Sequence, residues 1–148
     1  FRMFFDIDYI DSICLTIEDA INMAKIFKQY IEGSIYITYC ISYEPNGLIK
    51  TGMHFNCFDK IVDFTEAVEL RNIIVEKLME TKDMNWESIV DEGVYLPNRG
   101  MRMFGSRKAT KGKDKGKVYK LWFKIDDSGT NKIELTDIEL LKKLSIKI

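Results

Sequence analysis

A hairpin signal in the middle of the chain constrains the fold more than any other feature of the sequence. The stretch Ser34–Glu44 is rich in β-branched and aromatic residues that alternate, and residues 48–58 return after a Pro-Asn-Gly turn at 45–47. Two runs of this kind around a turn predict two antiparallel strands. We therefore expect an antiparallel sheet at the centre of the molecule.

Helical periodicity flanks this hairpin on both sides. Apolar residues recur at helical spacing over residues 17–31, behind a capping box of Thr16 and Asp19, and again over 65–81, which Thr65 is expected to cap. The other expected elements are a buried strand at 1–7, a short helix or turn at 86–90, a loop at 91–100, a strand at 101–105, a loop at 106–117, a strand at 118–125, a turn at 126–131 and a last helix from 136 to about 144. The order β-α-β-β-α-β-β-α predicts an α+β (α/β) fold in which helices pack on a largely antiparallel sheet.

The composition is that of one globular domain. The chain has 148 residues, of which 46% are hydrophobic and 30% charged, with two prolines and nine glycines. We expect a single domain over residues 1–148, and, because Phe1 opens directly on a strand, a fragment of a longer chain. No apolar run is long enough to cross a membrane and no secretory leader is visible, which favours an intracellular location, in cytoplasm or nucleus, without a membrane partner.

Charge and cysteine content narrow the chemistry only slightly. A net charge of −1 neither indicates nor excludes nucleic acid, because the distribution of charge matters more than its sum. Cys14, Cys40 and Cys57 fit free thiols in a reducing compartment. His54 is the single histidine, and no Cys-x-x-Cys pair exists, so a structural zinc site is not expected.

Asp6 and Asp8 are the first candidates for chemistry. Two residues apart in a strand, their carboxylates project on the same face, where a cation would relieve their repulsion. Hard oxygen ligands favour Mg²⁺ or Mn²⁺. The alternative is a solvated strand end with two surface acids, and by Asp11 the chain is expected to have turned.

A second constellation lies on the strand at 48–58. Lys50, Gly52 and His54 share one face of it, and Gly52 opens space between a cation and an imidazole, which suits a phosphate group. The alternative is a half-buried histidine that bonds to a backbone carbonyl.

The stretch from residue 90 to residue 117 carries the remaining candidates. Asp91 follows apolar residues. Arg102 is expected to point opposite to its methionine neighbours on a strand. If Arg102 lies on the inner face of the sheet, its charge needs an anionic partner from a ligand or from the protein. Residues 106–117 contain six basic residues and one acid. Such a segment either binds along the phosphate backbone of a nucleic acid or is a solvated flexible loop.

In combination these features are more specific than singly. The chain carries, in order, an apolar residue before Asp-x-Asp, a histidine on a strand, and an apolar residue before an Asp that is followed by Val-Tyr, Asn-Arg, Arg and Ser-x-Lys. This order of motifs resembles the archaeo-eukaryotic primase superfamily. Within it, the chain is similar to eukaryotic primase-polymerases and to the primase domains of large DNA virus helicase-primases. The resemblance runs from Phe4 to about Tyr119, and Val90–Lys108 is its most specific part. It implies an RRM-like sheet as the primase catalytic core, with most of the usual N-terminal module truncated.

The resemblance implies roles for individual residues. Asp6, Asp8 and Asp91 would be the catalytic, metal-binding carboxylates for two Mg²⁺ or Mn²⁺ ions, and His54 would contact the nucleotide triphosphate. The further nucleotide-binding residues would be Lys50, Arg102 and Lys108, and the nucleic-acid-binding residues Asn98, Arg99, Arg107, Lys111, Lys113 and Lys115. The second motif is usually Ser-x-His, and Gly52 stands at the serine position, so that its hydroxyl contact is lost or supplied by a backbone N–H.

The expected function is template-directed nucleotidyl transfer by two-metal-ion catalysis. The chain would act as a DNA primase or primase-polymerase that makes or extends primers on single-stranded DNA from NTP or dNTP. A helicase domain or protein is a further expected partner, and a viral or mobile-element origin would place the protein at a viral replication site. The alternatives are a single-stranded nucleic-acid binding module without catalysis, and a metal-dependent phosphodiesterase or nuclease.

Overall fold

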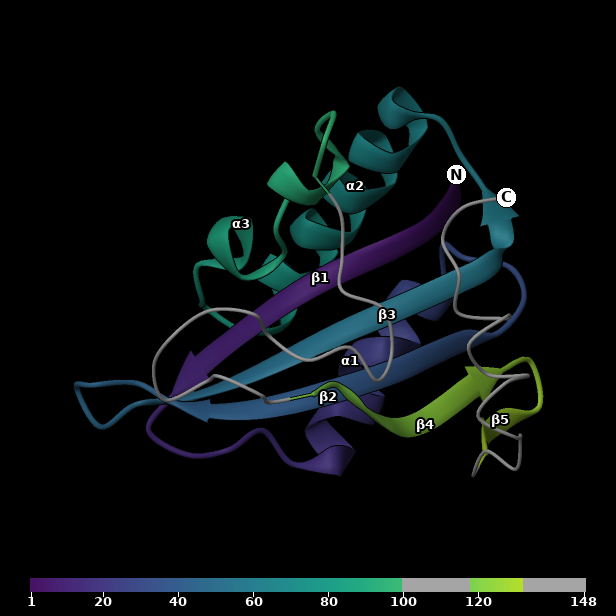
Figure 1. Cartoon of the computed structure of the whole chain (residues 1–148). Coiled ribbons are helices and arrows are strands. Elements are labelled where there is room, and N and C mark those ends of the chain that lie inside the picture. Colours follow the sequence, from purple (N-terminus) through teal and green to yellow (C-terminus); the bar gives the residue numbers. More distant parts are fainter. Residues whose placement is uncertain (100–117, 132–148) are drawn as a thin grey trace.

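The computed structural model describes residues 1–99 and 118–131, and these residues form an α+β fold (Figure 1). The elements are, in chain order, β1 (Arg2–Asp11), α1 (Ile17–Lys28), β2 (Ile35–Tyr43), β3 (Ile49–Ile61), α2 (Phe64–Thr81), α3 (Trp86–Ile89), the 3₁₀ helix η1 (Gly93–Tyr95), β4 (Lys120–Asp126) and β5 (Gly129–Asn131). The expected strand at 101–105, the loop at 106–117 and the helix from 136 lie outside the described residues.

One antiparallel sheet organises the described residues. The strand order is β1-β3-β2-β4-β5, and each neighbouring pair is antiparallel. β1 and β2 therefore run in the same direction with β3 between them, which is the split βαβ arrangement. An antiparallel bridge between Ile7 and Val90 adds the segment after α3 to the other side of β1. The predicted antiparallel sheet with packed helices is confirmed.

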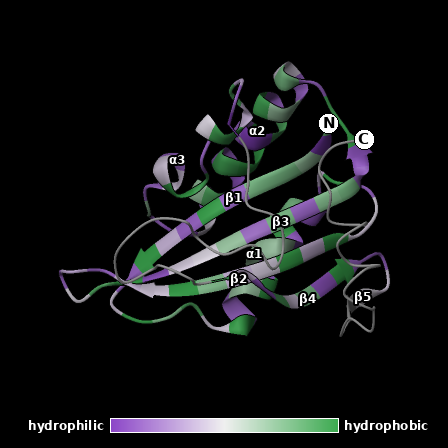
Figure 2. Ribbon diagram, viewed as in Figure 1, coloured by the Kyte–Doolittle hydropathy of each residue, from purple (hydrophilic) through white to green (hydrophobic). Residues whose placement is uncertain are grey.

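The hydrophobic core lies between one face of the sheet and the helices α1 and α2 (Figure 1). Phe27 of α1 packs between Phe5 of β1 and Phe55 of β3, with ring centroids 4.7 Å apart in both pairs. Polar residues alternate with these core residues along β1 and β3, as Figure 2 shows. Since neighbouring strand residues point to opposite faces, the polar residues gather on the face away from the core. None of the helices in this part of the chain is long and apolar enough to cross a membrane.

Two strands are longer than their apolar patterns predict. β1 continues to Asp11 instead of ending at residue 7, and β3 continues to Ile61 instead of 58. The two strands pair with each other from Arg2–Ile61 to Asp11–Ile49, so backbone hydrogen bonds extend each strand beyond its apolar run. Asp6 and Asp8 therefore lie within a strand rather than at its end, and the expectation that the chain has turned at Asp11 is wrong.

Two further sequence expectations need correction. α1 begins at the predicted cap, where Thr16 accepts a hydrogen bond from Asp19 N–H at 3.1 Å, but it ends at Lys28. The chain leaves the helix early and Ile31 then packs into the core. Residues 129–131 form β5 instead of part of a turn, because they pair with β4. The three cysteines are free thiols, as expected.

The N-cap of α2 is Asp63, not the predicted Thr65. Asp63 Oδ1 accepts a hydrogen bond from Glu66 N–H at 2.8 Å, and α2 starts at Phe64. Asp and Thr are both common N-cap residues, and helical periodicity alone does not determine at which of the two the helix begins.

The two positions offer a matched test of this cap. We expect Asp63→Ala to lower the free energy of unfolding by about 1 kcal/mol, because it leaves a first-turn N–H without its partner. Thr65→Ala, at an exposed position inside the first turn, should change it by less than about 0.5 kcal/mol. Urea denaturation of both variants beside the wild type measures the difference, and equal effects would contradict the assignment.

Candidate functional site

The face of the sheet opposite the helices brings together the residues predicted on β1 and β3. Asp6 lies directly across from His54, and Asp8 across from Gly52. Directly paired residues on antiparallel strands point to the same face, so both carboxylates share a face with Lys50, Gly52 and His54. The two predicted constellations, separated by some forty residues in the sequence, are therefore one cluster.

Asp91 joins this cluster from the other side of β1. Val90 pairs with Ile7, and Asp91 N–H donates to the Asp6 carbonyl at 2.9 Å. Val90 is fully buried on the core side, so the next residue, Asp91, points to the same face as Asp6. The three predicted carboxylates thus come from adjacent backbone segments and face the same way.

Each carboxylate of this cluster has a polar neighbour within the protein. Lys50 Nζ lies 2.8 Å from Asp8 Oδ2, His54 Nε2 lies 3.6 Å from Asp6 Oδ1, and Asp91 Oδ1 accepts a hydrogen bond from Gly93 N–H at 2.8 Å. Over residues 1–99 and 118–131, no three His, Cys, Asp or Glu side chains stand close enough together to hold a metal ion. The oxygen donors are those that Mg²⁺ and Mn²⁺ prefer, and a cation at Asp8 would have to displace the Lys50 ammonium.

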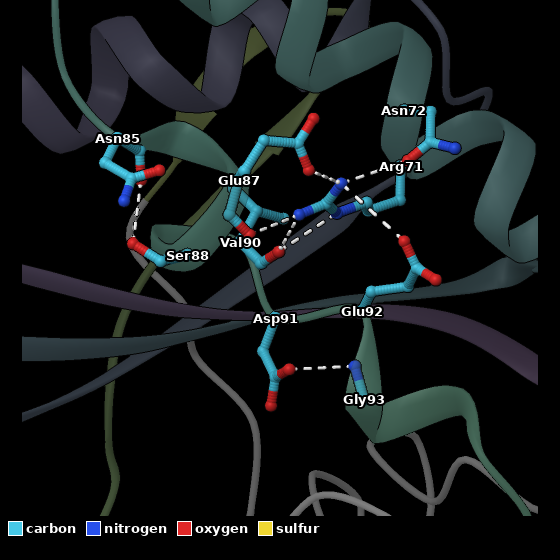
Figure 3. Close-up of polar contacts among 9 residues, drawn as sticks. All are labelled: Arg71, Asn72, Asn85, Glu87, Ser88, Val90, Asp91, Glu92 and Gly93. Atoms are coloured by element: carbon cyan, nitrogen blue, oxygen red, sulfur yellow. Dashed lines mark hydrogen bonds and ion pairs between the residues drawn. The ribbon is translucent and has the colours of Figure 1, made fainter.

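Arg71 of α2 fixes the segment that carries Asp91 (Figure 3). Its side chain is only 1% exposed. Arg71 Nε and Nη2 donate to the Val90 carbonyl at 3.0 and 2.6 Å, and Nη2 also donates to the Glu87 carbonyl at 2.6 Å. Nη1 reaches the Glu87 carboxylate at 2.6 Å and Asn72 Oδ1 at 3.0 Å. One guanidinium therefore satisfies the carbonyls at the end of α3, immediately before Asp91.

Sequence reasoning missed Arg71, although the sequence carries a signal for it. The core-facing stripe of α2 is formed by the residues that the helix buries, which are Ala67, Arg71, Ile74, Val75 and Leu78. An arginine four residues after Ala67 and three before Ile74 lies on that stripe. A charge at such a position needs buried acceptors, which here are carbonyls from a different element.

Tyr119 covers the centre of the cluster, and sequence reasoning gave it no role. Its ring stacks on the His54 imidazole, with centroids 3.7 Å apart and planes 14° apart. A Cβ atom at Gly52 would lie 2.6 Å from the Tyr119 hydroxyl oxygen. Gly52 does leave space between Lys50 and His54, but that space holds the phenol of Tyr119. His54 is accordingly only 3% exposed.

Tyr95 of η1 lies at the Phe4 end of the same face. Its hydroxyl donates to the Phe4 carbonyl at 2.7 Å, and its ring packs 5.4 Å from that of Phe4. Burial raises the pKa of the Tyr95 hydroxyl well above its usual value, so that the group stays a protonated donor. This bond ties the loop after Asp91 to β1.

The remaining predicted residues divide into two groups. Asn98 and Arg99 lie exposed in the turn after η1, where Asn98 has a left-handed φ of 64° and Arg99 N–H donates to the Leu96 carbonyl at 3.1 Å. The predicted residues Arg102, Arg107, Lys108, Lys111, Lys113 and Lys115 lie outside the described residues.

Comparison with known proteins adds one match. A family model described as the N-terminal AEP domain of the C962R protein matches residues 1–123. No curated protein and no solved structure matches the chain. The matched range covers every residue of the cluster on the open face of the sheet, from Asp6 to Tyr119.

Proposed function

The chain belongs to the family of the N-terminal AEP (archaeo-eukaryotic primase) domain of the C962R protein, and we propose on this basis that it catalyses template-directed nucleotidyl transfer. Membership of this family indicates a primase-type nucleotidyltransferase. In our proposal the chain synthesises or extends primers on single-stranded DNA, as a DNA primase or primase-polymerase. The observation that carries the proposal is that Asp6, Asp8 and Asp91, from two distant segments, face the same way on adjacent backbone segments.

In this proposal the three aspartates hold two Mg²⁺ or Mn²⁺ ions. When bound, such ions lower the pKa of the attacking 3′-hydroxyl and neutralise the pyrophosphate leaving group. Asp91 and Asp6 are held in place by the bond between their backbones, at 2.9 Å. Asp8 would bind the cation in place of its present partner Lys50, and the Lys50 ammonium would then be available to pair with an anion. The Lys50 ammonium would thus balance the negative charge of Asp8 in the free protein and that of a phosphate in the complex.

The substrate contacts that we propose follow from the same face of the sheet. Lys50 and His54 border the position of the triphosphate of an incoming NTP or dNTP, and Arg102 and Lys108 add positive charge to it. The single-stranded template is bound through its phosphates, with little dependence on base sequence. The residues proposed for this role are Asn98, Arg99, Arg107, Lys111, Lys113 and Lys115. A helicase domain or protein is the further partner in this proposal.

Nucleotide incorporation tests the proposed function directly. The protein is incubated with single-stranded DNA, with and without an annealed primer, and with labelled dNTP or NTP in Mn²⁺, Mg²⁺ or EDTA. We expect metal-dependent products that lengthen with time, and products without a primer identify a primase. Shortened DNA would instead indicate a nuclease, and DNA binding without any product would indicate a binding module; either result overturns the proposal.

A further inference from the structure

The hydroxyl of Tyr119 occupies the middle of a row of three residues on β3. Lys50, Gly52 and His54 point to the same face in succession, and the Tyr119 hydroxyl oxygen would lie 2.6 Å from a Cβ on the central one. Any side chain at position 52 therefore competes with this hydroxyl. The glycine in the row leaves room for a group that comes from a distant part of the chain.

The stacked ring fixes where this hydroxyl can be. The Tyr119 ring lies nearly parallel to the His54 imidazole at a centroid distance of 3.7 Å, and both side chains are buried, at 5% and 3% exposure. A phenol held in this way presents its O–H from a pre-set position, so little side-chain entropy is lost when the hydroxyl donates to a ligand.

The charges around the hydroxyl select the kind of ligand. Lys50 brings a cation to this row of residues, which favours an oxyanion as the ligand. Asp8 lies across the sheet from Gly52 and would repel a bare anion. An anion that arrives with its own divalent cation satisfies both requirements, because the cation binds the carboxylates while the anion binds the donors.

We propose that Tyr119 is a nucleotide-binding residue, whose hydroxyl, held over Gly52 between Lys50 and His54, donates a hydrogen bond to a phosphate oxygen of a metal-complexed polyphosphate. Gly52 is the position that makes room for it. This inference rests on the proposed function and adds to it a phosphate ligand from outside the β1 and β3 cluster. It also accounts for the absence of a hydroxyl at residue 52, since Tyr119 supplies one there.

The contact itself can be tested without any ligand. His54 is the single histidine, so its imidazole C–H signals can be assigned without ambiguity in a proton NMR spectrum. We expect these signals to be shifted upfield by the Tyr119 ring, to stay shifted in Tyr119→Phe, and to move toward ordinary values in Tyr119→Leu. Signals that are identical in all three proteins would overturn the stacked arrangement and with it the inference.

Calorimetric binding of inorganic tripolyphosphate with Mg²⁺ tests the role of the hydroxyl. Tyr119→Phe keeps the ring and removes only the O–H, and we expect about ten-fold weaker binding, the usual effect of a lost hydrogen bond to a charged group. Gly52→Ser should also weaken binding, since its side chain collides with the phenol oxygen. In the double variant G52S/Y119F the serine supplies a hydroxyl in the vacated space, and binding should recover toward the wild-type value.

The results separate this inference from the proposed function. If Tyr119→Phe binds tripolyphosphate as the wild type does, or if the double variant binds no better than Tyr119→Phe, the hydroxyl is no ligand and the inference fails, while wild-type nucleotide incorporation still supports the function. If the hydroxyl effect and its recovery are observed but the wild type incorporates no nucleotide, the inference stands and the proposed function fails. If the wild type neither binds tripolyphosphate nor incorporates nucleotide, both fail.

Discussion

We expect Asp91→Asn to lower metal-dependent nucleotide incorporation by about a thousand-fold or more. Loss of one carboxylate charge removes several kcal/mol of metal-centred transition-state stabilisation, and each 1.4 kcal/mol corresponds to a factor of about ten in rate. The substitution preserves the shape of the side chain and an oxygen that can accept from Gly93 N–H. The backbone bond from residue 91 to the Asp6 carbonyl is also retained. The loss should therefore appear in primer extension with either Mn²⁺ or Mg²⁺, with an unchanged circular dichroism spectrum.

A matched control separates the role of Asp91 from a general effect of charge. Asp83→Asn makes the same chemical change at an exposed position just after α2, away from the open face of the sheet. We expect incorporation to stay within about two-fold of the wild type, since exposed substitutions of this kind have small effects. Full activity of Asp91→Asn, measured beside this control, would remove Asp91 from the proposed metal site.

The second large effect is expected for Arg71→Met, which should lower the free energy of unfolding by about 3 kcal/mol. The substitution keeps an unbranched apolar stem in the core but removes every donor to the Val90 and Glu87 carbonyls. A buried acceptor that loses its partner costs about 1 to 3 kcal/mol, and two are affected here. For a chain of this size the melting temperature should fall by about 10 °C, which differential scanning calorimetry measures.

Glu87→Gln is the control for the ion pair in this network. The Glu87 side chain is 60% exposed, so its attraction to Arg71 is screened by solvent, and the carbonyl contacts of Arg71 remain in this variant. We expect a loss of less than about 1 kcal/mol. If Glu87→Gln were as destabilising as Arg71→Met, the ion pair rather than the carbonyl contacts would hold the segment before Asp91.

Local sequence patterns predicted the elements well where one short-range cause dominates. The alternation around the Pro-Asn-Gly turn predicted β2 and β3, and the capping box at Thr16 predicted the start of α1. The predictions were wrong where a partner elsewhere decides the end of an element. β1 is prolonged by pairing with β3, and residues 129–131 became a strand by pairing with β4. Hydrogen bonds between strands depend on which strands meet, and no local pattern encodes that.

The sequence by itself determined which residues share a face within one strand. Asp6 with Asp8, and Lys50 with His54, follow from the two-residue period of a strand, which needs no knowledge of the rest of the fold. Only the tertiary structure decided that these two pairs lie beside each other on neighbouring strands and that Asp91 lies beside Asp6. It also decided that Arg71 binds the carbonyls before Asp91 and that Tyr119 covers Gly52. These contacts join segments that are far apart along the chain. Their positions depend on strand order and register, which are set by the packing of the whole core rather than by any single segment.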